Sequence, residues 1–312
     1  MTYPPPPPRA HSPGQAFETE APAKLNLYLH VLARRPDGYH DLASLVAFAD
    51  LADTVHAAPA AAFGFAATGP MAAALGEDME ANLCVRAARG LAALLGREPA
   101  VALTLVKRLP VASGIGGGSA DAAATLRVLT RFWGAEPEGL AELAASLGAD
   151  VPACLRGVAA EIFSIGEEVR PVPPLPAAAV VLVNPGVPLP TARVFREWGG
   201  PGTPPPPWLA PPHAAALAAS LMKRRNDLTE AALKQVPEIA EVLAALSARP
   251  DCLLARMSGS GATCFGLFEN ADVAAAAAEV MQATHPTWWV RAARLLESPP
   301  AVRLAGAEPP AA

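Results

Sequence analysis

The chain has 312 residues, of which 52% are hydrophobic and 17% are charged, and its formal net charge is −5. This length favours two domains, and this composition is typical of a globular protein rather than a disordered one. The net negative charge argues against a nucleic-acid-binding protein, because a polyanion needs a basic surface and no long basic run occurs.

Both ends of the chain are low in complexity. Residues 1–15 contain five consecutive prolines and are predicted to form a disordered tail, as are the Ala/Pro-rich residues 300–312. The N-terminus has no apolar stretch of the kind found in a signal peptide. The uncharged stretches 54–76 and 171–192 are interrupted by Pro or Gly, so neither is expected to cross a membrane. We therefore expect a cytoplasmic protein with no membrane partner.

Between these ends, apolar periodicity predicts a mixture of strands and helices. In chain order it predicts a strand over 25–31, a helix over 82–95, a strand over 101–106, helices over 119–133 and 140–147, a strand over 180–183, helices over 213–223, 227–234 and 237–248, a strand over 263–268, a helix over 273–283 and a strand over 288–293. Strands and helices do not alternate regularly, which predicts the α+β class. Prolines between 171 and 176 predict a domain boundary, and residues 199–212 are predicted to form a Pro/Gly loop.

The four cysteines and six histidines carry no metal-binding signature. Cys84, Cys154, Cys252 and Cys264 form no CxxC pair, and the histidines show neither HxH nor HExxH spacing. The cysteines are expected to be reduced and mostly buried.

A glycine-rich loop is the strongest local signal. Gly114, Gly116, Gly117 and Gly118 follow a predicted strand, and a predicted helix begins near Ser119. Glycines allow close backbone approach, and the amides of such a turn and of a helix N-terminus bind phosphate. Ser119 can cap the helix or offer its hydroxyl to a phosphate or to Mg²⁺. The spacing excludes a Walker loop and a dinucleotide fingerprint; the alternative is a connector that serves packing alone.

Three blocks of the sequence resemble the GHMP small-molecule kinases. They are residues 21–27 (APAKLNL) with 35–42 (RPDGYHDL), the loop 109–123 with 147–152 (LGADVP), and residues 257–265 (MSGSGATCF). Shorter matches fall between them, in the expected order, at 82–83, 184–186, 191–195 and 225–228. The glycine loop alone identifies the superfamily. The other motifs are similar to those of the branch that acts on a cytidyl-linked methylerythritol.

The resemblance implies a GHMP kinase fold of two α+β domains with the active site in the cleft between them. The expected domains are residues 16–170, which bind ATP, and residues 171–299. The implied reaction transfers a phosphoryl group from ATP, with Mg²⁺, to the 2-hydroxyl of a small molecule that carries a cytidine diphosphate group. That step belongs to the non-mevalonate route to isoprenoid precursors.

The resemblance also implies roles for individual residues. Asp150 is the expected general base, and Lys24 is expected to pair with it and to place positive charge near the transferred phosphoryl group. The nucleotide is expected to contact Pro110, Gly114, Ile115, Gly116, Gly117, Gly118, Ser119 and Ala120, with Ser119 as the candidate ligand of the Mg²⁺ bound to ATP. From the residues alone, an exposed strand charge is the favoured reading of Lys24 and a turn residue that of Asp150; the resemblance reverses both.

The substrate side is expected to use aromatic residues. In the family, the positions of Tyr39 and Phe195 sandwich the cytosine and that of His40 reads its edge. Asn26 should face the same side of its strand as Lys24 and can orient substrate hydroxyls, while Thr191 is a further candidate. Ordinary core packing is the alternative for both Tyr39 and Phe195.

Three other functions stay open at the level of sequence. They are another GHMP kinase acting on mevalonate, homoserine or a sugar, a nucleotide-binding module without catalysis, and a nucleic-acid binder. A second glycine turn at 257–262 either closes the cleft near the substrate phosphates, as the resemblance implies, or only leads into a strand. Lys107 and Asn82 lie where the family contacts the nucleotide, but their spacing assigns them no role.

Overall fold

A computed structural model describes residues 14–306, so the tail predicted over residues 1–15 lies almost wholly outside the described residues. The described strands are β1 (Phe17–Arg34), β2 (His40–Ala58), β3 (Gly64–Thr68), β4 (Ala102–Val106), β5 (Ala160–Ser164), β6 (Glu168–Pro171), β7 (Ala179–Asn184), β8 (Leu254–Met257), β9 (Cys264–Phe268), β10 (Trp289–Arg294) and β11 (Arg303–Leu304). The described helices are α1 (Leu83–Leu94), α2 (Gly117–Trp133), α3 (Leu140–Leu147), α4 (Val151–Arg156), α5 (Thr191–Glu197), α6 (Ala214–Met222), α7 (Thr229–Gln235), α8 (Glu238–Ser247) and α9 (Ala271–Thr284), with 3-10 turns at Ala72–Ala74 and Met79–Ala81. The predicted α+β class is confirmed.

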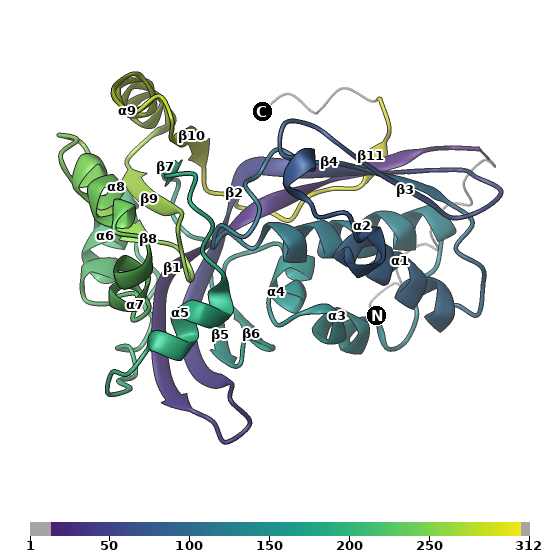
Figure 1. Ribbon diagram of the computed structural model, residues 1–312, viewed down its shortest axis with the longest axis horizontal. Helices are drawn as coiled ribbons and strands as arrows, with labels where there is room; N and C mark the ends of the chain where they lie inside the picture. Colours follow the sequence, from purple (N-terminus) through teal and green to yellow (C-terminus); the bar gives the residue numbers. More distant parts are fainter. Residues whose placement is uncertain (1–13, 307–312) are drawn as a thin grey trace, which may run out of the picture.

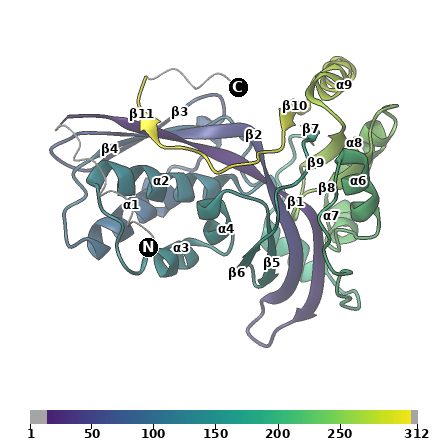
Figure 2. The ribbon, with the colours of Figure 1, turned by 180° about the vertical axis from the view of Figure 1, so that it is seen from behind.

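The strands form two sheets. The first has the order β11-β1-β2-β4-β3, with β5 also pairing with β2 and β6 with β5. Strand β2 accommodates two partners on one edge because β4 pairs with Thr54–Ala58 and β5 with Leu42–Val46. The second sheet has the order β10-β7-β9-β8 and is antiparallel. Helices α1 to α4 lie on one side of the first sheet, and α6 to α9 lie around the second (Figures 1 and 2).

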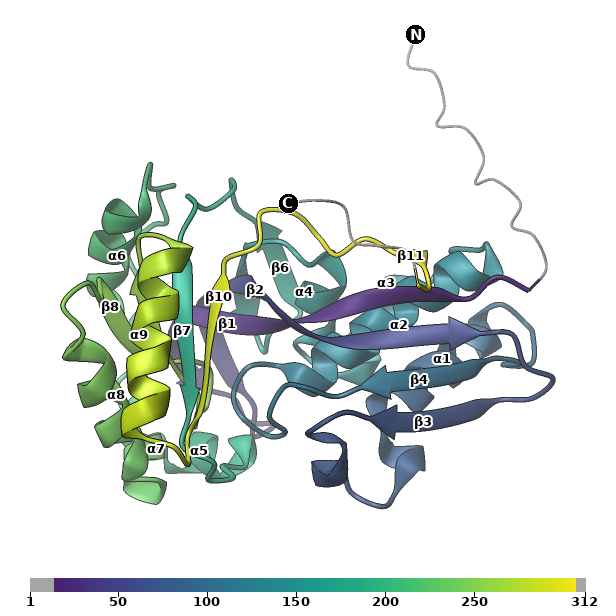
Figure 3. The ribbon, with the colours of Figure 1, turned by 90° about the horizontal axis from the view of Figure 1, so that it is seen from above.

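The two sheets meet along the long hairpin of β1 and β2. Figure 3 shows β1 running from the first sheet to the second, and Leu29 of β1 forms a bridge with Asn226. The chain passes from one sheet to the other between β6 and β7, over residues 172–178, close to the boundary expected at residues 170–171.

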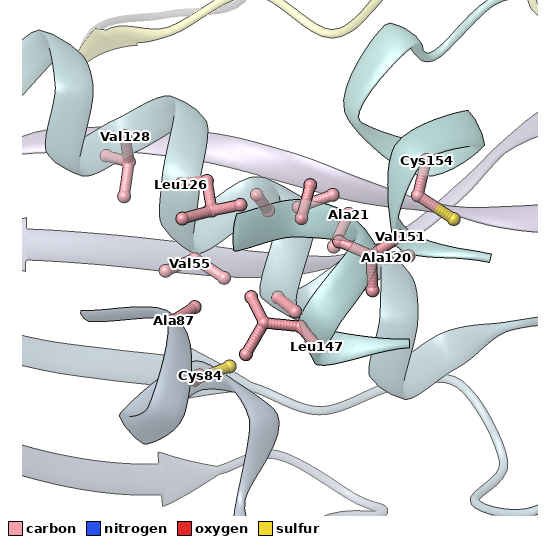
Figure 4. Packing of buried hydrophobic residues seen from close by; sticks show 14 of the residues in the cluster. Ala21, Val55, Cys84, Ala87, Ala120, Leu126, Val128, Leu147, Val151 and Cys154 are labelled. Atoms are coloured by element: carbon pink, nitrogen blue, oxygen red, sulfur yellow. The ribbon is translucent and has the colours of Figure 1, made fainter. Parts of the chain in front are cut away.

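Three hydrophobic cores hold this arrangement. The first lies between the first sheet and α1–α4, where Val55 of β2 faces Leu126 of α2 and Leu147 of α3 (Figure 4). Strand β7 supplies the other two alternately, because successive side chains of a strand point to opposite faces. Val181 and Val183 lie in the second core with α7–α9, while Val180 and Leu182 lie in the third.

The third core joins the two halves of the molecule. Leu25, Leu27 and Leu45 of the β1–β2 hairpin pack there with Val180 and Leu182 of β7. All five side chains are fully buried. The two domains are therefore fastened together by apolar packing and not only by a connecting chain.

The C-terminal segment corrects the expectation of a disordered tail. Residues 303–304 form β11, which pairs with β1, so residues 300–306 are not a disordered tail. The segment returns to the first sheet as early as Leu296, whose amide donates to the carbonyl of Phe48 (2.7 Å). Arg303 forms ion pairs with Glu18 and Glu20 of β1. These pairs compensate the negative charge of the two glutamates, which make the start of β1 atypical of a strand.

Ser119 does not cap α2. The helix begins at Gly117, and its N-cap is Gly116, whose φ of 64° is left-handed. Ser119 therefore lies within the first turn, where its side chain faces the cavity described below.

Candidate active site

A cavity of about 370 Å³ lies where the two sheets meet. Its wall combines Lys24 and Asn26 of β1, Asp150 before α4, Thr191 of α5, and the two glycine turns at 114–119 and 259–260. Residues from both halves of the chain therefore meet in it, as expected for a cleft between domains.

Lys24 and Asp150 form an ion pair in this cavity. The Lys24 Nζ lies 2.9 Å from Asp150 Oδ1 and also donates to Asn26 Oδ1 at 3.0 Å. The Lys24 side chain is only 4% exposed, so the reading as an exposed strand charge is wrong, whereas that of Asp150 is 38% exposed. The expected facing of Lys24 and Asn26 is present, and Ser44 fixes the Asn26 amide by accepting from its Nδ2 (2.8 Å).

Asp150 is held in place by backbone structure on both sides. Helix α3 ends at Leu147, and Asp150 is the N-cap of α4. Its side chain makes no capping hydrogen bond to α4. The carboxylate is therefore directed to Lys24 and to the cavity, with one oxygen free to accept a proton.

The glycine loop leaves little room for a side chain at Gly114, Gly116 or Gly117. A Cβ added at Gly116 would come within 3.0 Å of Lys24 Cε, and one at Gly117 within 3.1 Å of Lys107 Nζ. Gly114 and Gly116 have φ values of 77° and 64°, in the left-handed region that favours glycine. The backbone of Gly116–Ser119 thus lines the cavity directly at the N-terminus of α2, an arrangement that suits a phosphate chain.

The side chains of the remaining loop residues that were predicted to contact the nucleotide, Pro110, Ile115 and Ala120, do not line the cavity. The Ala120 side chain is buried in the first core and that of Ile115 in the third. The carbonyl of Pro110 accepts from the Ser113 hydroxyl (2.7 Å). These three residues therefore shape the loop.

A buried charge cluster lies next to the glycine loop. Its lysine, Lys107, has no role assigned from the sequence. Lys107 Nζ donates to Asp53 Oδ2 (2.5 Å) and to Asp121 Oδ2 (2.7 Å), and all three side chains are at most 4% exposed. Asp53 Oδ1 accepts from the amide of Leu109 (2.9 Å). Lys107 thereby ties the strand before the loop to the first turns of α2 after it.

Burial acts on the ionisation of this cluster. Burial raises the pKa of Asp121 to about 7, against the opposing attraction of Lys107. Burial alone would lower the pKa of Lys107, but Asp121 and Asp53 outweigh it and raise that pKa. Asn82, the other residue without an assigned role, is the N-cap of α1 and accepts from the amide of Cys84 (2.9 Å).

The second glycine turn packs backbone to backbone against the first. The Ser258 hydroxyl donates to the carbonyl of Gly114 (3.0 Å), and a Cβ on Gly114 would come within 2.6 Å of the carbonyl oxygens of Ser258 and Gly261. Asn226 fixes this turn by donating from Nδ2 to the carbonyls of Met257 and Gly259 (both 2.8 Å). Asn226 was not predicted as a site residue, although it lies in the short block 225–228 that resembles the GHMP kinases.

An aromatic cavity of about 550 Å³ adjoins the first one, and the two share Leu42, Ala149, Ile165, Thr191 and Phe195. His40 and Phe195 lie in its wall with ring centroids 5.1 Å apart and planes inclined by 36°. His40 is 7% exposed, and its Nε2 has no partner among residues 14–306. Burial, together with the nearby Arg34, lowers the pKa of His40, so the ring is neutral at pH 7.

Tyr39 and Thr191 complete the predicted substrate side. Tyr39 is 59% exposed at the tip of the β1–β2 hairpin, so ordinary core packing does not account for it. Its amide donates to Asp37 Oδ1 (3.0 Å), and Gly38 has a φ of 88°, as a tight turn requires. Thr191 Oγ1 lies 2.8 Å from Ser260 Oγ, between the two cavities.

Over residues 14–306, no group of three or more His, Cys, Asp or Glu side chains could hold a metal ion by itself. A cation bound through a nucleotide would therefore depend on the phosphates for most of its ligands. In the same range no helix has the length and apolarity needed to span a membrane. The four cysteines are free, and three of them are buried, as expected.

Known proteins resemble this chain over most of its length. The GHMP kinases N terminal domain family matches residues 82–158, and the GHMP kinases C terminal family matches residues 213–287. The 4-diphosphocytidyl-2-C-methyl-D-erythritol kinase of Paramagnetospirillum magneticum is 51% identical, covering 90% of this chain and 99% of that protein. The enzyme of the same name from Cereibacter sphaeroides is 53% identical, covering 89% and 99%.

Solved structures give the same result. A crystal structure of 4-(cytidine 5′-diphospho)-2C-methyl-D-erythritol kinase superposes with a TM-score of 0.74 at 36% identity, covering 89% of this chain and 98% of that one. A homoserine kinase from Cytophaga hutchinsonii superposes with a TM-score of 0.70 at 17% identity. At that identity the second likeness concerns the fold alone.

Proposed function

Because the chain belongs to the 4-diphosphocytidyl-2-C-methyl-D-erythritol kinases of the GHMP kinase family, we propose that it phosphorylates the 2-hydroxyl of that cytidyl-linked alcohol with Asp150 as the general base. It is an ATP-dependent small-molecule kinase, and its reaction belongs to the non-mevalonate route to isoprenoid precursors. The observation that carries the assignment of the base is the Lys24–Asp150 ion pair, which lies between the glycine loop and the aromatic cavity.

The chemistry at Asp150 requires one proton transfer. As the substrate oxygen forms its bond to the γ-phosphorus of ATP, the hydroxyl proton passes to the carboxylate of Asp150 and the bond from that phosphorus to the bridging oxygen of ADP breaks. Lys24 holds the Asp150 carboxylate in place through their ion pair and offsets negative charge that develops on the transferred group. Positioning and charge neutralisation supply most of the rate in such transfers.

The triphosphate is assigned to the first glycine loop. The amides of Gly116, Gly117 and Gly118 line the cavity at the N-terminus of α2, where backbone donors and the helix dipole favour an anion. A divalent cation supplies neutralisation of phosphate charge when bound with ATP. We assign the Ser119 hydroxyl, the side chain of the loop that faces the cavity, to that Mg²⁺ or to a phosphate oxygen.

The cytidine diphosphate part of the substrate is assigned to the aromatic cavity. Tyr39 and Phe195 offer ring faces for stacking on the base, and the unpartnered His40 Nε2 offers a hydrogen bond to its edge. Asn26 and Thr191 lie between this cavity and Asp150, where they can contact the substrate hydroxyls and phosphates.

We further assign nucleotide binding to residues 16–170 and the closing half of the cleft to residues 171–299, and we place the enzyme in the cytoplasm. A nucleotide-binding module without catalysis is disfavoured by the intact Lys24–Asp150 pair. The aromatic cavity of the protein favours a substrate that carries a nucleobase over homoserine or mevalonate.

The test is an ATP-consumption assay with 4-diphosphocytidyl-2-C-methyl-D-erythritol, mevalonate and homoserine in parallel, with phosphorus NMR of the products. We expect consumption with the cytidyl substrate alone and a new phosphomonoester resonance on its 2-oxygen. Consumption driven only by mevalonate or homoserine would overturn the substrate assignment. ATP binding without consumption on any of the three alcohols would overturn the catalytic one.

A further inference from the structure

Two aromatic residues at the end of α5 contact His40. Phe195 lies in the helix, and Trp198 is its C-cap residue with an extended backbone. The Trp198 and His40 ring centroids lie 5.6 Å apart with their planes at 87°, an edge-to-face contact. The Phe195 ring is tilted by 36° to the same imidazole.

His40 needs such support because its Nε2 makes no hydrogen bond. The bond between Cβ and the ring is a broad torsion, so an imidazole with no fixed partner can turn its nitrogens away from a ligand. The edge-to-face contact with Trp198 fixes the plane of the ring, since aromatic pairs prefer that geometry. With Trp198 in place, the nearly buried imidazole stays at the aromatic cavity with Nε2 unpartnered.

The Pro/Gly loop, residues 199–212, begins directly after Trp198. The loop is anchored on β1 through the carbonyl of Thr203, which accepts from His30 Nδ1 (2.9 Å). The carbonyls of Pro206 and Pro207 accept from Arg224 Nη2 (3.0 and 2.9 Å). A loop with so many prolines adds little flexibility between these anchors, so the anchored loop limits movement of Trp198.

Trp198 does not line the aromatic cavity. It lines a separate cavity of about 760 Å³ on the other side, between the loop and α7. The indole reaches the substrate side through its ring contact with His40, and it also packs against the second core. A smaller apolar side chain at this position can be accommodated beside the open space of the separate cavity.

We propose that Trp198 is a positioning residue for substrate recognition, which keeps the His40 imidazole oriented toward the base of the cytidyl substrate. The inference rests on the proposed function, in which His40 contacts that base. It also gives the 199–212 loop a role, which is to support Trp198 and through it His40 beside the aromatic cavity.

The test compares Trp198→Leu with Trp208→Leu, an identical substitution within the 199–212 loop. Trp208 packs against Tyr28 and Arg224, away from both substrate-side cavities. An aromatic pair contributes enough that Trp198→Leu should raise KM for the cytidyl substrate about threefold to tenfold, with kcat and KM for ATP unchanged. Trp208→Leu should leave KM for the cytidyl substrate as in the wild type, and Trp198→Phe, which keeps a ring edge, should restore most of the loss.

The deciding measurement repeats the Trp198→Leu substitution in a protein that already carries His40→Ala. If Trp198 acts through His40, then Trp198→Leu adds no further increase in KM to His40→Ala. In the otherwise wild-type protein the imidazole proton resonances of His40 should also shift in Trp198→Leu, because the indole ring current is lost.

The outcomes separate this inference from the proposed function. A His40→Ala variant with unchanged KM for the cytidyl substrate would overturn the base contact, and the inference with it. A raised KM in His40→Ala, combined with no effect of Trp198→Leu or with effects that multiply in the double variant, would overturn the inference alone. An equal rise in KM for ATP would show a general distortion of the site and would likewise overturn it.

Discussion

Lys24 and Asp150 show how two ordinary residues acquire a function through their surroundings. Lys24 is almost fully buried, and the only carboxylate within ion-pair distance of its ammonium is that of Asp150 among residues 14–306. Asp150, by contrast, is open to the cavity. An acceptor alcohol can therefore reach the carboxylate, while the lysine cannot leave it without an almost fully buried ammonium losing its only carboxylate partner among residues 14–306.

Asp150→Asn is expected to fold normally and to lose most turnover. The amide keeps the shape of the side chain but takes up no proton, and a general base contributes about 10²–10⁴ in rate. Steady-state kinetics should show kcat lowered by that factor, with KM for ATP close to the wild-type value. A purified variant with unchanged kcat would remove Asp150 from the proton transfer.

Lys107→Met is expected to destabilise the protein strongly. The substitution leaves the buried carboxylates of Asp53 and Asp121 close together without their cation. Removing one partner of a buried ion pair costs about 3–5 kcal/mol. Urea unfolding monitored by circular dichroism should show a loss of this size.

A matched control is Lys234→Met, which removes the exposed partner of Glu230 on α7. Exposed pairs contribute about 0–1 kcal/mol, so this variant should unfold almost as the wild type does. Equal losses in the two lysine variants would contradict the assigned importance of the buried cluster.

At the scale of elements, the site depends on the contact between two glycine turns. The loop before α2 and the turn before β9 come from different halves of the chain, and the carbonyls of one occupy the space where a side chain of the other would lie. Close packing of backbone on backbone holds Gly114 against Ser258, and Asn226 holds the second turn from behind. The elements are thus positioned by each other as much as by their own sequences.

Gly114→Ala is expected to separate the two turns. Its Cβ would come within 2.6 Å of two backbone oxygens, in addition to the left-handed φ of 77°. Gly134→Ala serves as control, because Gly134 has a φ of 65° with nothing within 4 Å of an added Cβ. The control should cost only the conformational penalty of about 1–2 kcal/mol.

For Gly114→Ala we expect a larger loss of unfolding free energy and a raised KM for ATP, measured by urea titration and steady-state kinetics. A Gly114→Ala variant no less stable than Gly134→Ala would contradict the tight docking of the turns.

On the scale of the whole molecule, contacts that cross between the halves determine stability. The third core joins the two sheets, and the segment from Leu296 to β11 returns to the first sheet. His30 adds a polar contact of the same kind. Its Nδ1 donates to the carbonyl of Thr203, and its Nε2 accepts from the amide of Arg225 (3.3 Å), so the ring must be neutral.

This contact predicts a loss of stability in mild acid. Burial lowers the pKa of His30 below its ordinary value of about 6.5, so the unfolded chain takes up the proton first as the pH falls. The stabilisation is fully present above about pH 6.5 and is lost as the pH falls from there through the folded-state pKa. His40 shifts in the same direction and adds to the effect.

Urea unfolding at several pH values between 5 and 7.5 should therefore show a His30 contribution to the free energy of unfolding that rises with pH, against the opposite contribution of Asp121, whose raised pKa favours the folded state at lower pH. His30→Asn keeps a donor for Thr203 but cannot titrate, so its slope should be smaller than that of the wild type. An unchanged slope in His30→Asn would assign the pH dependence to other groups.

Local patterns in the sequence were sufficient for much of the fold and for the family. The helices with a clear apolar face, such as α1 (Leu83–Leu94) and α3 (Leu140–Leu147), lie where the spacing predicts them, because side-chain burial on one face is a local property. The glycine loop could be recognised equally well from the sequence, since glycine suits a backbone that lines a cavity so closely. Short elements such as α4 and α5 were missed because six or seven residues carry too little periodicity.

What the sequence alone determined is therefore the helices and strands with a clear periodicity, together with the glycine loop. Tertiary structure decided which distant residues meet: Lys24 and Asp150 are 126 positions apart, and Lys107 and Asp53 are 54 apart. Strand β2 was missed for the same reason, because its buried Ser44 and Asp53 are satisfied by partners outside the strand. A polar side chain can be buried only where the fold brings it a partner, and no local pattern contains that partner.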